Sequence, residues 1–77
     1  MARASEPQPE LAAAIKAFRS ENGLSQEDLA HQAGITTSAL ARIESGRVDP
    51  AWGTVRSIAS GLGVSLSALA ERAERAG

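Results

Sequence analysis

Apolar residues recur every three or four positions along most of this chain, which is the spacing of amphipathic α-helices. In the first such segment, Leu11, Ile15 and Phe18 fall on one face. The pattern predicts a helix over residues 10–22 that ends before Gly23, because an Asn-Gly pair is typical of a helix end. No run of alternating β-branched residues predicts a strand anywhere in the sequence. The hydrophobic pattern therefore indicates an all-α fold.

Two shorter helices, joined by a tight turn, are predicted in the next part of the chain. Ser25, with an aspartate three residues later, resembles a capping box at the start of a helix over residues 25–33. Gly34 follows, at a place where a left-handed backbone conformation often ends a helix. Thr36 is a suitable cap for a third helix over residues 36–44. Because only about three residues separate these helices, we expect them to cross steeply.

The last third of the chain predicts two more helices. Pro50 suits the start of a helix over residues 51–62, and Ser65 is a suitable cap for a fifth helix. The predicted inner face of the fourth helix consists of Trp52, Val55, Ile58, Ala59 and Leu62. Gly61 has two interpretations, which are close packing against a neighbouring element and local softness of the helix.

Composition divides the chain into three parts. Residues 1–9 contain two prolines and no apolar run, which predicts a disordered tail. Residues 10–70 form the predicted domain, and residues 71–77 either extend the fifth helix or form a tail. With 77 residues, no cysteine and few aromatic residues, the core must be built from Leu, Ile, Val and Ala. The sequence has neither a membrane-spanning apolar stretch nor a signal pattern, so we expect a cytoplasmic protein without a membrane partner.

The helix over residues 36–44 divides into an apolar and a polar face. Leu40 and Ile43, with Thr36, share the predicted inner face. The predicted outer face carries Thr37, Ser38, Ala41, Arg42 and Ser45. The side chains of this face are small apart from one arginine, so the helix fits a DNA major groove, which is about 12 Å wide. Any amphipathic helix has a polar side, but the capped helix and glycine turn before this one favour DNA binding over that simpler interpretation.

Residues around these helices form a more extended pattern. It comprises residues 23–30 (GLSQEDLA), 33–36 (AGIT), Ser38, 42–47 (RIESGR), Pro50, Thr54, 58–59 and 62–66 (LGVSL). In these residues the chain resembles the helix-turn-helix family of phage repressor and Cro proteins, also called the xenobiotic-response-element family, over residues 11–69. The resemblance implies a compact five-helix bundle of the lambda-repressor-like DNA-binding type, with the helix-turn-helix formed by the second and third helices. It also implies sequence-specific binding of double-stranded DNA by a transcriptional regulator.

The resemblance implies roles for individual residues as well. Arg19 and Glu44 are expected to form a partly buried ion pair that fixes the first helix against the third. Gln26 is expected to contact the phosphate backbone and to brace the recognition helix. The residues expected to position the protein on the DNA backbone are Thr36, Ser45 and Arg47.

Four residues of the outer face are candidates for contacting bases: Thr37, Ser38, Ala41 and Arg42. Arg42 is able to make a bidentate contact with guanine, which is worth ~1–3 kcal/mol of discrimination. Thr37 or the Ala41 methyl group is able to meet a thymine methyl group. Because Thr37 and Ser38 are short, indirect or water-mediated readout is favoured at their positions.

The formal net charge of −1 is low for a protein that binds DNA by bulk electrostatics. We therefore expect few phosphate contacts and weak non-specific binding. One domain of this size buries too little surface for operator affinity at physiological salt. Together with the resemblance, this predicts a homodimer whose recognition helices lie about 34 Å apart on a palindromic operator.

No pattern in the sequence indicates an enzyme, a cofactor or a metal site. His31 is the single histidine, is expected on the surface, and has no cysteine to join it in a ligand cluster. Neither a nucleophile with its base nor a glycine loop for phosphate is present. The alternative function is an antitoxin-like or accessory module that uses the same fold to hold a protein partner, which the slightly acidic charge favours.

Overall fold

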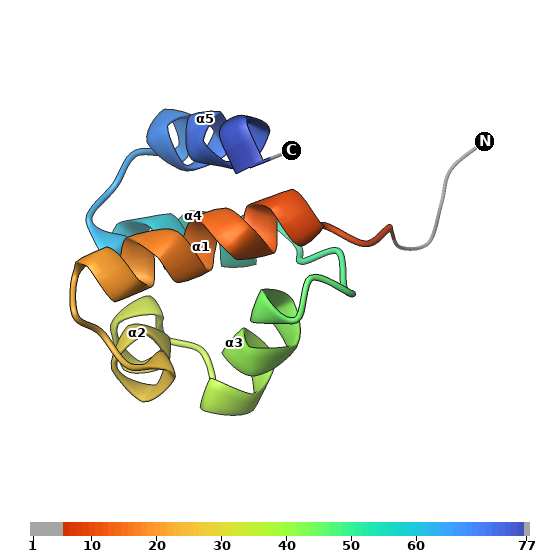
Figure 1. Ribbon diagram of the computed structural model, residues 1–77. Helices are drawn as coiled ribbons and strands as arrows, with labels where there is room; N and C mark the ends of the chain where they lie inside the picture. The colour runs from red at the N-terminus through yellow and green to blue at the C-terminus, as the bar shows by residue number, and fades with distance from the viewer. Residues whose placement is uncertain (1–5, 77) are drawn as a thin grey trace.

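The computed structural model describes residues 6–76, which fold into five α-helices and no strand (Figure 1). The helices are α1 (Pro9–Glu21), α2 (Gln26–Ala33), α3 (Thr37–Glu44), α4 (Trp52–Leu62) and α5 (Leu66–Ala76). In Figure 1, α2 and α3 lie on one side of α1, and α5 lies on the other. The all-α prediction is confirmed, and each observed helix begins and ends close to its predicted limits.

The start of the folded domain differs from its predicted limit. Helix α1 begins at Pro9, and the Gln8 backbone N–H donates a hydrogen bond to the Gly46 carbonyl over 3.0 Å. Gln8 and Pro9 therefore belong to the folded domain, and their assignment to a tail was wrong. Proline suits a first helical turn because its fixed φ is helical and its missing N–H is not needed there. Of the remainder of the predicted tail, Glu6 and Pro7 are exposed and lie outside any helix, and residues 1–5 lie outside the described residues.

At the other end, the two alternatives for the last residues are resolved in favour of the helix. Helix α5 continues to Ala76, so residues 71–76 extend it. Its start is capped as predicted, since the Ala68 N–H donates to the Ser65 hydroxyl over 3.0 Å.

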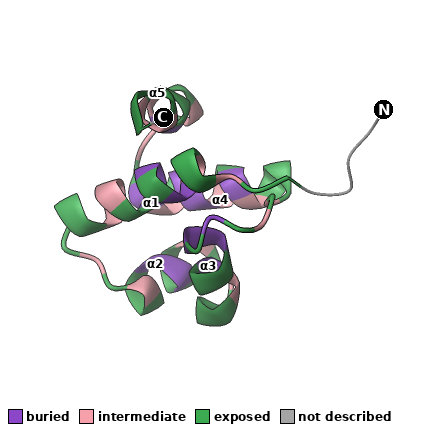
Figure 2. Cartoon of the chain, turned by 45° about the vertical axis from the view of Figure 1, so that its right-hand side comes forward, coloured by how far each residue is buried: buried purple, intermediate pink, exposed green. Residues whose placement is uncertain are grey.

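One apolar core joins all the helices. Its largest fully buried side chains come one from each helix, namely Ile15, Leu29, Leu40, Ile58 and Leu69. Figure 2 shows the buried faces turned toward the interior and the exposed faces toward solvent. Burial of each such side chain contributes roughly 1.5–3 kcal/mol, so this shared core fixes how the helices are placed relative to one another.

Gly61 is a site of close helix packing. A Cβ atom added there would lie 3.1 Å from the Ala33 backbone nitrogen and 3.3 Å from the Ala33 Cβ. The glycine therefore lets α4 approach the end of α2 more closely than a side chain permits. Of the two interpretations of Gly61, the structure supports packing.

Trp52 does not lie on the inner face predicted for it. The other predicted inner residues of α4 are buried, but Trp52 is 66% exposed. It is the first residue of α4, so it lies one turn before the buried part of the helix, where no described element covers it. Helical periodicity grouped this residue with the buried positions of α4, but it did not show that the first turn of the helix is left uncovered.

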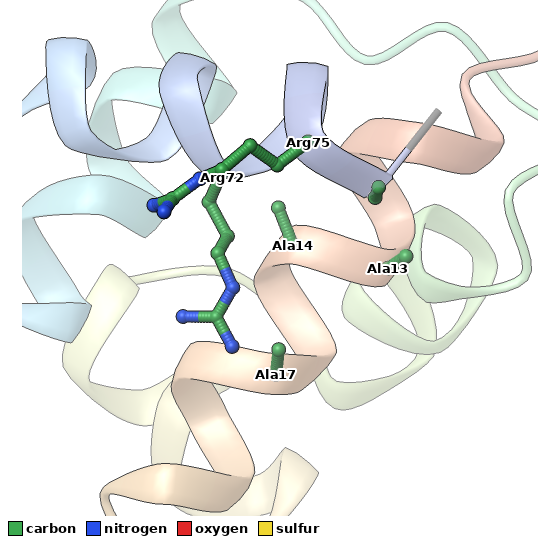
Figure 3. Close-up of a pocket in the computed structure, with 6 residues that line it drawn as sticks. Ala13, Ala14, Ala17, Arg72 and Arg75 are labelled. Carbon is green, nitrogen blue, oxygen red and sulfur yellow. The ribbon is translucent and has the colours of Figure 1, made fainter.

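Helix α5 is held against α1 by Arg72. Its guanidinium group bonds to the Glu21 carboxylate and lies 5.0 Å from the centre of the Phe18 ring. Figure 3 shows Arg72 reaching from α5 along the surface of α1 beside Ala17, whereas the Arg75 side chain points away from Ala17. The hydrogen bond from Arg72 lowers the pKa of Glu21 below its ordinary value. This contact closes the bundle on the side away from α3.

None of the helices in residues 6–76 is long and apolar enough to cross a membrane.

Candidate nucleic-acid interface

Helix α2 begins with a complete capping box. The Asp28 N–H donates to the Ser25 hydroxyl over 2.9 Å, and the Ser25 N–H donates to the Asp28 carboxylate over 3.1 Å. The hydrogen bond from the Ser25 backbone lowers the pKa of Asp28, with a smaller contribution from the Ser25 side chain. His31, on the same helix, is exposed as expected.

The turn between α2 and α3 is the tight glycine turn that the sequence predicts. Gly34 has a φ of 72°, which is left-handed and favours glycine. The Ile35 N–H then donates to the backbone carbonyl of Ala30 over 3.0 Å, which closes the end of α2. Thr36 caps α3 by accepting a hydrogen bond from the Ala39 N–H over 3.0 Å. Its side chain is exposed, so the prediction that Thr36 lies on the inner face was wrong, because the cap residue precedes the packed turns.

The outer face of α3 is open to solvent. Leu40 and Ile43 are buried beneath it. The exposed residues are those expected to face DNA, namely Thr37, Ser38, Ala41, Arg42 and Ser45. Figure 2 shows this helix green along its outer side. The surface carries hydroxyl groups, a methyl group and one cation, and no acidic residue of α3 interrupts it, since Glu44 is turned inward.

Glu44 is 4% exposed and accepts three hydrogen bonds. Arg19 donates from Nε to Oε2 over 2.8 Å and from Nη2 to Oε1 over 3.1 Å. Gln26 donates from Nε2 to Oε1 over 2.9 Å. The Arg19 Nη1 group also donates to the Leu24 carbonyl over 2.8 Å. The ion pair implied by the family resemblance is therefore present, and it joins α1, α2 and α3 at the end of the recognition helix.

Gln26 braces α3 through this bond to Glu44. A primary amide carries two N–H groups, so binding to Glu44 leaves one for another acceptor. Gln26 is the first residue of α2, where the free backbone N–H groups of the helix favour an anion. Its expected contact with a DNA phosphate is compatible with this position and stays a prediction.

Ser45 and Arg47 follow the end of α3 and are both exposed. The Ser45 hydroxyl donates to the Arg42 carbonyl and accepts from the Arg47 N–H over 3.3 Å. Ser45 therefore shapes the chain that presents Arg47, and its hydroxyl proton is already used within the protein.

Thr54 is a residue of this surface to which the sequence assigned no role. It lines a hollow of about 200 Å³ together with Arg42 and Pro50. Thr54 belongs to α4 and shares this hollow with Arg42 of α3, a proximity that the spacing of residues along either helix does not reveal. Among the described residues, no group of His, Cys, Asp and Glu side chains is arranged to hold a metal ion.

Comparison with known proteins identifies this arrangement. Residues 10–75 match the family model described as a helix-turn-helix domain. The chain belongs to the helix-turn-helix domain family. The match extends from α1 to α5 and so covers the whole fold rather than α2 and α3 alone.

One curated relative of this helix-turn-helix domain is the immunity repressor protein of Bacillus phage phi105. The two are 42% identical over 55 residues, which is 71% of this chain and 38% of the repressor. The chain thus spans less than half the length of that relative.

Two solved structures have the same fold. The restriction-modification controller protein C.Esp1396I superposes with a TM-score of 0.83 at 26% identity, covering 90% of both chains. The clp gene regulator ClgR from Corynebacterium glutamicum superposes with a TM-score of 0.83 at 25% identity, covering 88% of this chain and 72% of that one. The domain therefore has the helix-turn-helix fold of DNA-binding transcription regulators.

Proposed function

We propose that this protein regulates transcription by binding as a dimer to a palindromic operator, with α3 of each copy in the major groove. The observation that supports this most directly is the exposed outer face of α3. It presents small polar side chains and Arg42, while buried Leu40 and Ile43 hold the helix to the core. A helix with such a face fits a major groove, where base pairs differ in their hydrogen-bonding groups.

Arg42 is the principal base-reading residue in this proposal. It is exposed, and its guanidinium group can form two parallel hydrogen bonds with guanine O6 and N7. Thr37 and Ala41 offer methyl groups to thymine. Ser38 and Thr37 are too short to reach far into the groove, so water-mediated contacts and DNA shape supply the remaining discrimination.

The flanking residues position the domain on the phosphate backbone. Gln26 and Thr36 lie at the starts of α2 and α3, and Arg47 follows the end of α3. Ser45 contributes by holding the backbone that presents Arg47. These contacts set the register of α3 in the groove and carry little sequence information.

A dimer explains how so small and weakly charged a domain achieves specific binding. Each copy contributes few cations, and the affinity of one copy for a half-site is correspondingly low. Two linked copies read two half-sites at once. Their recognition helices are then about 34 Å apart, on the same side of the DNA.

The test begins by selecting bound sequences from a pool of random duplexes and asking whether they are palindromic. Gel-shift titrations then compare the wild-type protein with Arg42→Ala on the selected duplex and on a scrambled one. The matched control is Arg75→Ala, because Arg75 is an exposed arginine of α5, on the side of α1 away from α3. We expect Arg42→Ala to weaken binding to the selected duplex by about 5- to 150-fold, the equivalent of ~1–3 kcal/mol, and to change scrambled binding little. Equal losses on both duplexes would show that Arg42 does not read bases.

A further inference from the structure

A groove of about 420 Å³ lies between the start of α4, the start of α1 and α5. Most of its lining is apolar, and the residues used below are Leu11, Pro50, Trp52, Leu66, Ala70 and Ala73. Asp49 and Glu74 lie at its polar margin. It is therefore a mainly apolar depression with two carboxylates at its margin.

Trp52 is the one large apolar side chain among the described residues that is exposed, at 66%. Tryptophan buries roughly 150–250 Å² when it is covered, so leaving it in water forgoes a large favourable contribution. Here it stands at the edge of the groove. The same surface thus offers both a projecting side chain and a cavity able to receive one.

We propose that this groove is the surface through which two copies of the chain associate, with Trp52 of each copy inserted into the groove of its partner. The inference rests on the proposed function, which requires two copies but does not say where they meet. A two-fold interface brings a surface patch against the same patch on the partner. Because this patch contains both a projection and a cavity, Trp52 of each copy can enter the groove of the other copy.

The position of the groove relative to α3 supports a second copy as the occupant. Asp49 and Pro50 belong to the segment that directly follows α3, so the groove adjoins the end of the recognition helix. Figure 1 shows the starts of α1 and α4 on the side of the molecule near α3 and away from α2. A two-fold axis through this side leaves α2 at the outer edges and directs both α3 helices toward the same surface, as a palindrome requires.

The area that such a contact would bury agrees with this assignment. Two tryptophans, and the two grooves that cover them, bury on the order of 1,000 Å² in total, at the low end for a specific interface. The resulting dimer would be reversible, as expected for a regulator that assembles on its operator.

Tryptophan fluorescence tests the inference directly, because Trp52 is the single tryptophan of the chain. We expect the emission of the DNA-free protein to shift to shorter wavelength as concentration rises and Trp52 leaves water. The shift should follow the increase in mass measured by sedimentation equilibrium. If the protein dimerises while the emission stays that of an exposed tryptophan, the interface lies elsewhere and the inference is overturned.

Two substitutions and one control locate the contact. Trp52→Ala removes the projection, and Ala70→Glu places a charge in the groove beside Glu74, while both residues are exposed and leave the core intact. Each should raise the dimer dissociation constant at least about thirtyfold, because truncating a central aromatic anchor typically has an effect of this size. Ala13→Glu makes the same chemical change at an exposed position of α1 outside the groove, and should leave dimerisation unchanged. Unchanged dimerisation in Trp52→Ala would overturn the inference.

Binding to DNA separates failure of this inference from failure of the proposed function. Trp52→Ala should bind a duplex with one half-site as the wild-type protein does, and should lose only the extra affinity that a second half-site provides. Should Trp52→Ala retain that extra affinity, the protein would bind its palindrome through another interface. Absence of any preferred duplex for the wild-type protein would instead contradict the proposed function, and the fluorescence titration without DNA would still decide the role of Trp52.

Discussion

Arg19 in α1 and Glu44 at the end of α3 form an ion pair with two hydrogen bonds across 25 positions of sequence. The side chain of Glu44 is 2% exposed and that of Arg19 is 17% exposed, so both charges are largely removed from water. The arrangement makes the orientation of the recognition helix depend on α1. It also means that neither charge is tolerated there without the other.

We therefore expect Arg19→Ala to lower the free energy of unfolding by about 3–5 kcal/mol, because it leaves the Glu44 carboxylate buried without its cation. The double variant Arg19→Leu with Glu44→Leu should lose less than Arg19→Ala alone, since no charge is then left unpaired. Urea denaturation followed by circular dichroism measures both. The single variants Arg19→Leu and Glu44→Leu complete the comparison. If the double variant lost as much stability as these two single variants lose together, the residues would not act as a pair.

A second prediction concerns the contact between Gly61 and Ala33. Gly61→Ala places a methyl group 3.1 Å from the Ala33 nitrogen, so α2 or α4 must shift. We expect a loss of about 1–3 kcal/mol in stability, which is typical of overpacking. Because α2 carries Gln26, the same shift should also weaken DNA binding.

Gly53→Ala is the matched control for this prediction. Gly53 lies in the same helix, and a Cβ atom there meets nothing within 4 Å. Alanine should therefore stabilise α4 by up to about 1 kcal/mol through its better helix propensity. Thermal denaturation of the two variants should give shifts of opposite sign, and shifts of the same sign would contradict the packing interpretation.

The features that were predictable from the sequence are those with local causes. Ser25, Gly34 and Ser65 mark helix ends through bonds to residues a few positions away, and each was interpreted correctly. The opening of α1 is the local exception, because Gln8 is held by Gly46, which is distant in the sequence. Where local patterns failed, as at Gln8, or left alternatives, as at Gly61, the outcome depends on contacts with residues that are distant in the sequence.

The candidate site shows the same division. The outer face of α3 follows from helical periodicity, which places Arg42 opposite Leu40 and Ile43. The surroundings of Thr54 and Trp52 do not follow, because they depend on where residues of other helices are placed around α4. The Arg19–Glu44 pair was implied only by resemblance to a family, since nothing local links residues so far apart.

The capping box predicts a specific dependence of stability on pH. The pKa of Asp28 is lowered in the folded protein, chiefly by the hydrogen bond from the Ser25 backbone N–H. A lowered folded-state pKa adds stability above the unfolded-state pKa, which is about 3.9, and this contribution is lost as the pH falls through the folded-state value. Asp28→Asn should therefore be less stable than the wild-type protein at neutral pH, and the difference should shrink as the pH falls below the unfolded-state pKa.

Denaturant midpoints of the two proteins across this range measure the effect. Glu27→Gln is the control, because Glu27 is an exposed carboxylate of the same helix turn and accepts no capping bond from Ser25. At neutral pH, Glu27→Gln should differ less in stability from the wild-type protein than Asp28→Asn does. A deficit in Asp28→Asn that stays constant down to the most acidic pH would exclude the carboxylate as its source.

The last prediction concerns the dependence of DNA binding on salt. Of the residues facing DNA in our proposal, only Arg42 and Arg47 carry a full positive charge, and Arg42 is directed at bases. Few counterions are then released per dimer, and the plot of log K against log salt concentration should have a slope of magnitude below about 5. Arg47→Ala should reduce that slope by roughly 2 for a dimer, whereas Trp52→Ala should halve the slope on a palindrome by leaving one copy bound. Binding isotherms from about 50 to 300 mM KCl measure all three. A slope near −10 in the wild-type protein would mean that cations outside this surface, such as Arg56 or Lys16, contact the phosphates and that the interface is larger than the exposed face of α3.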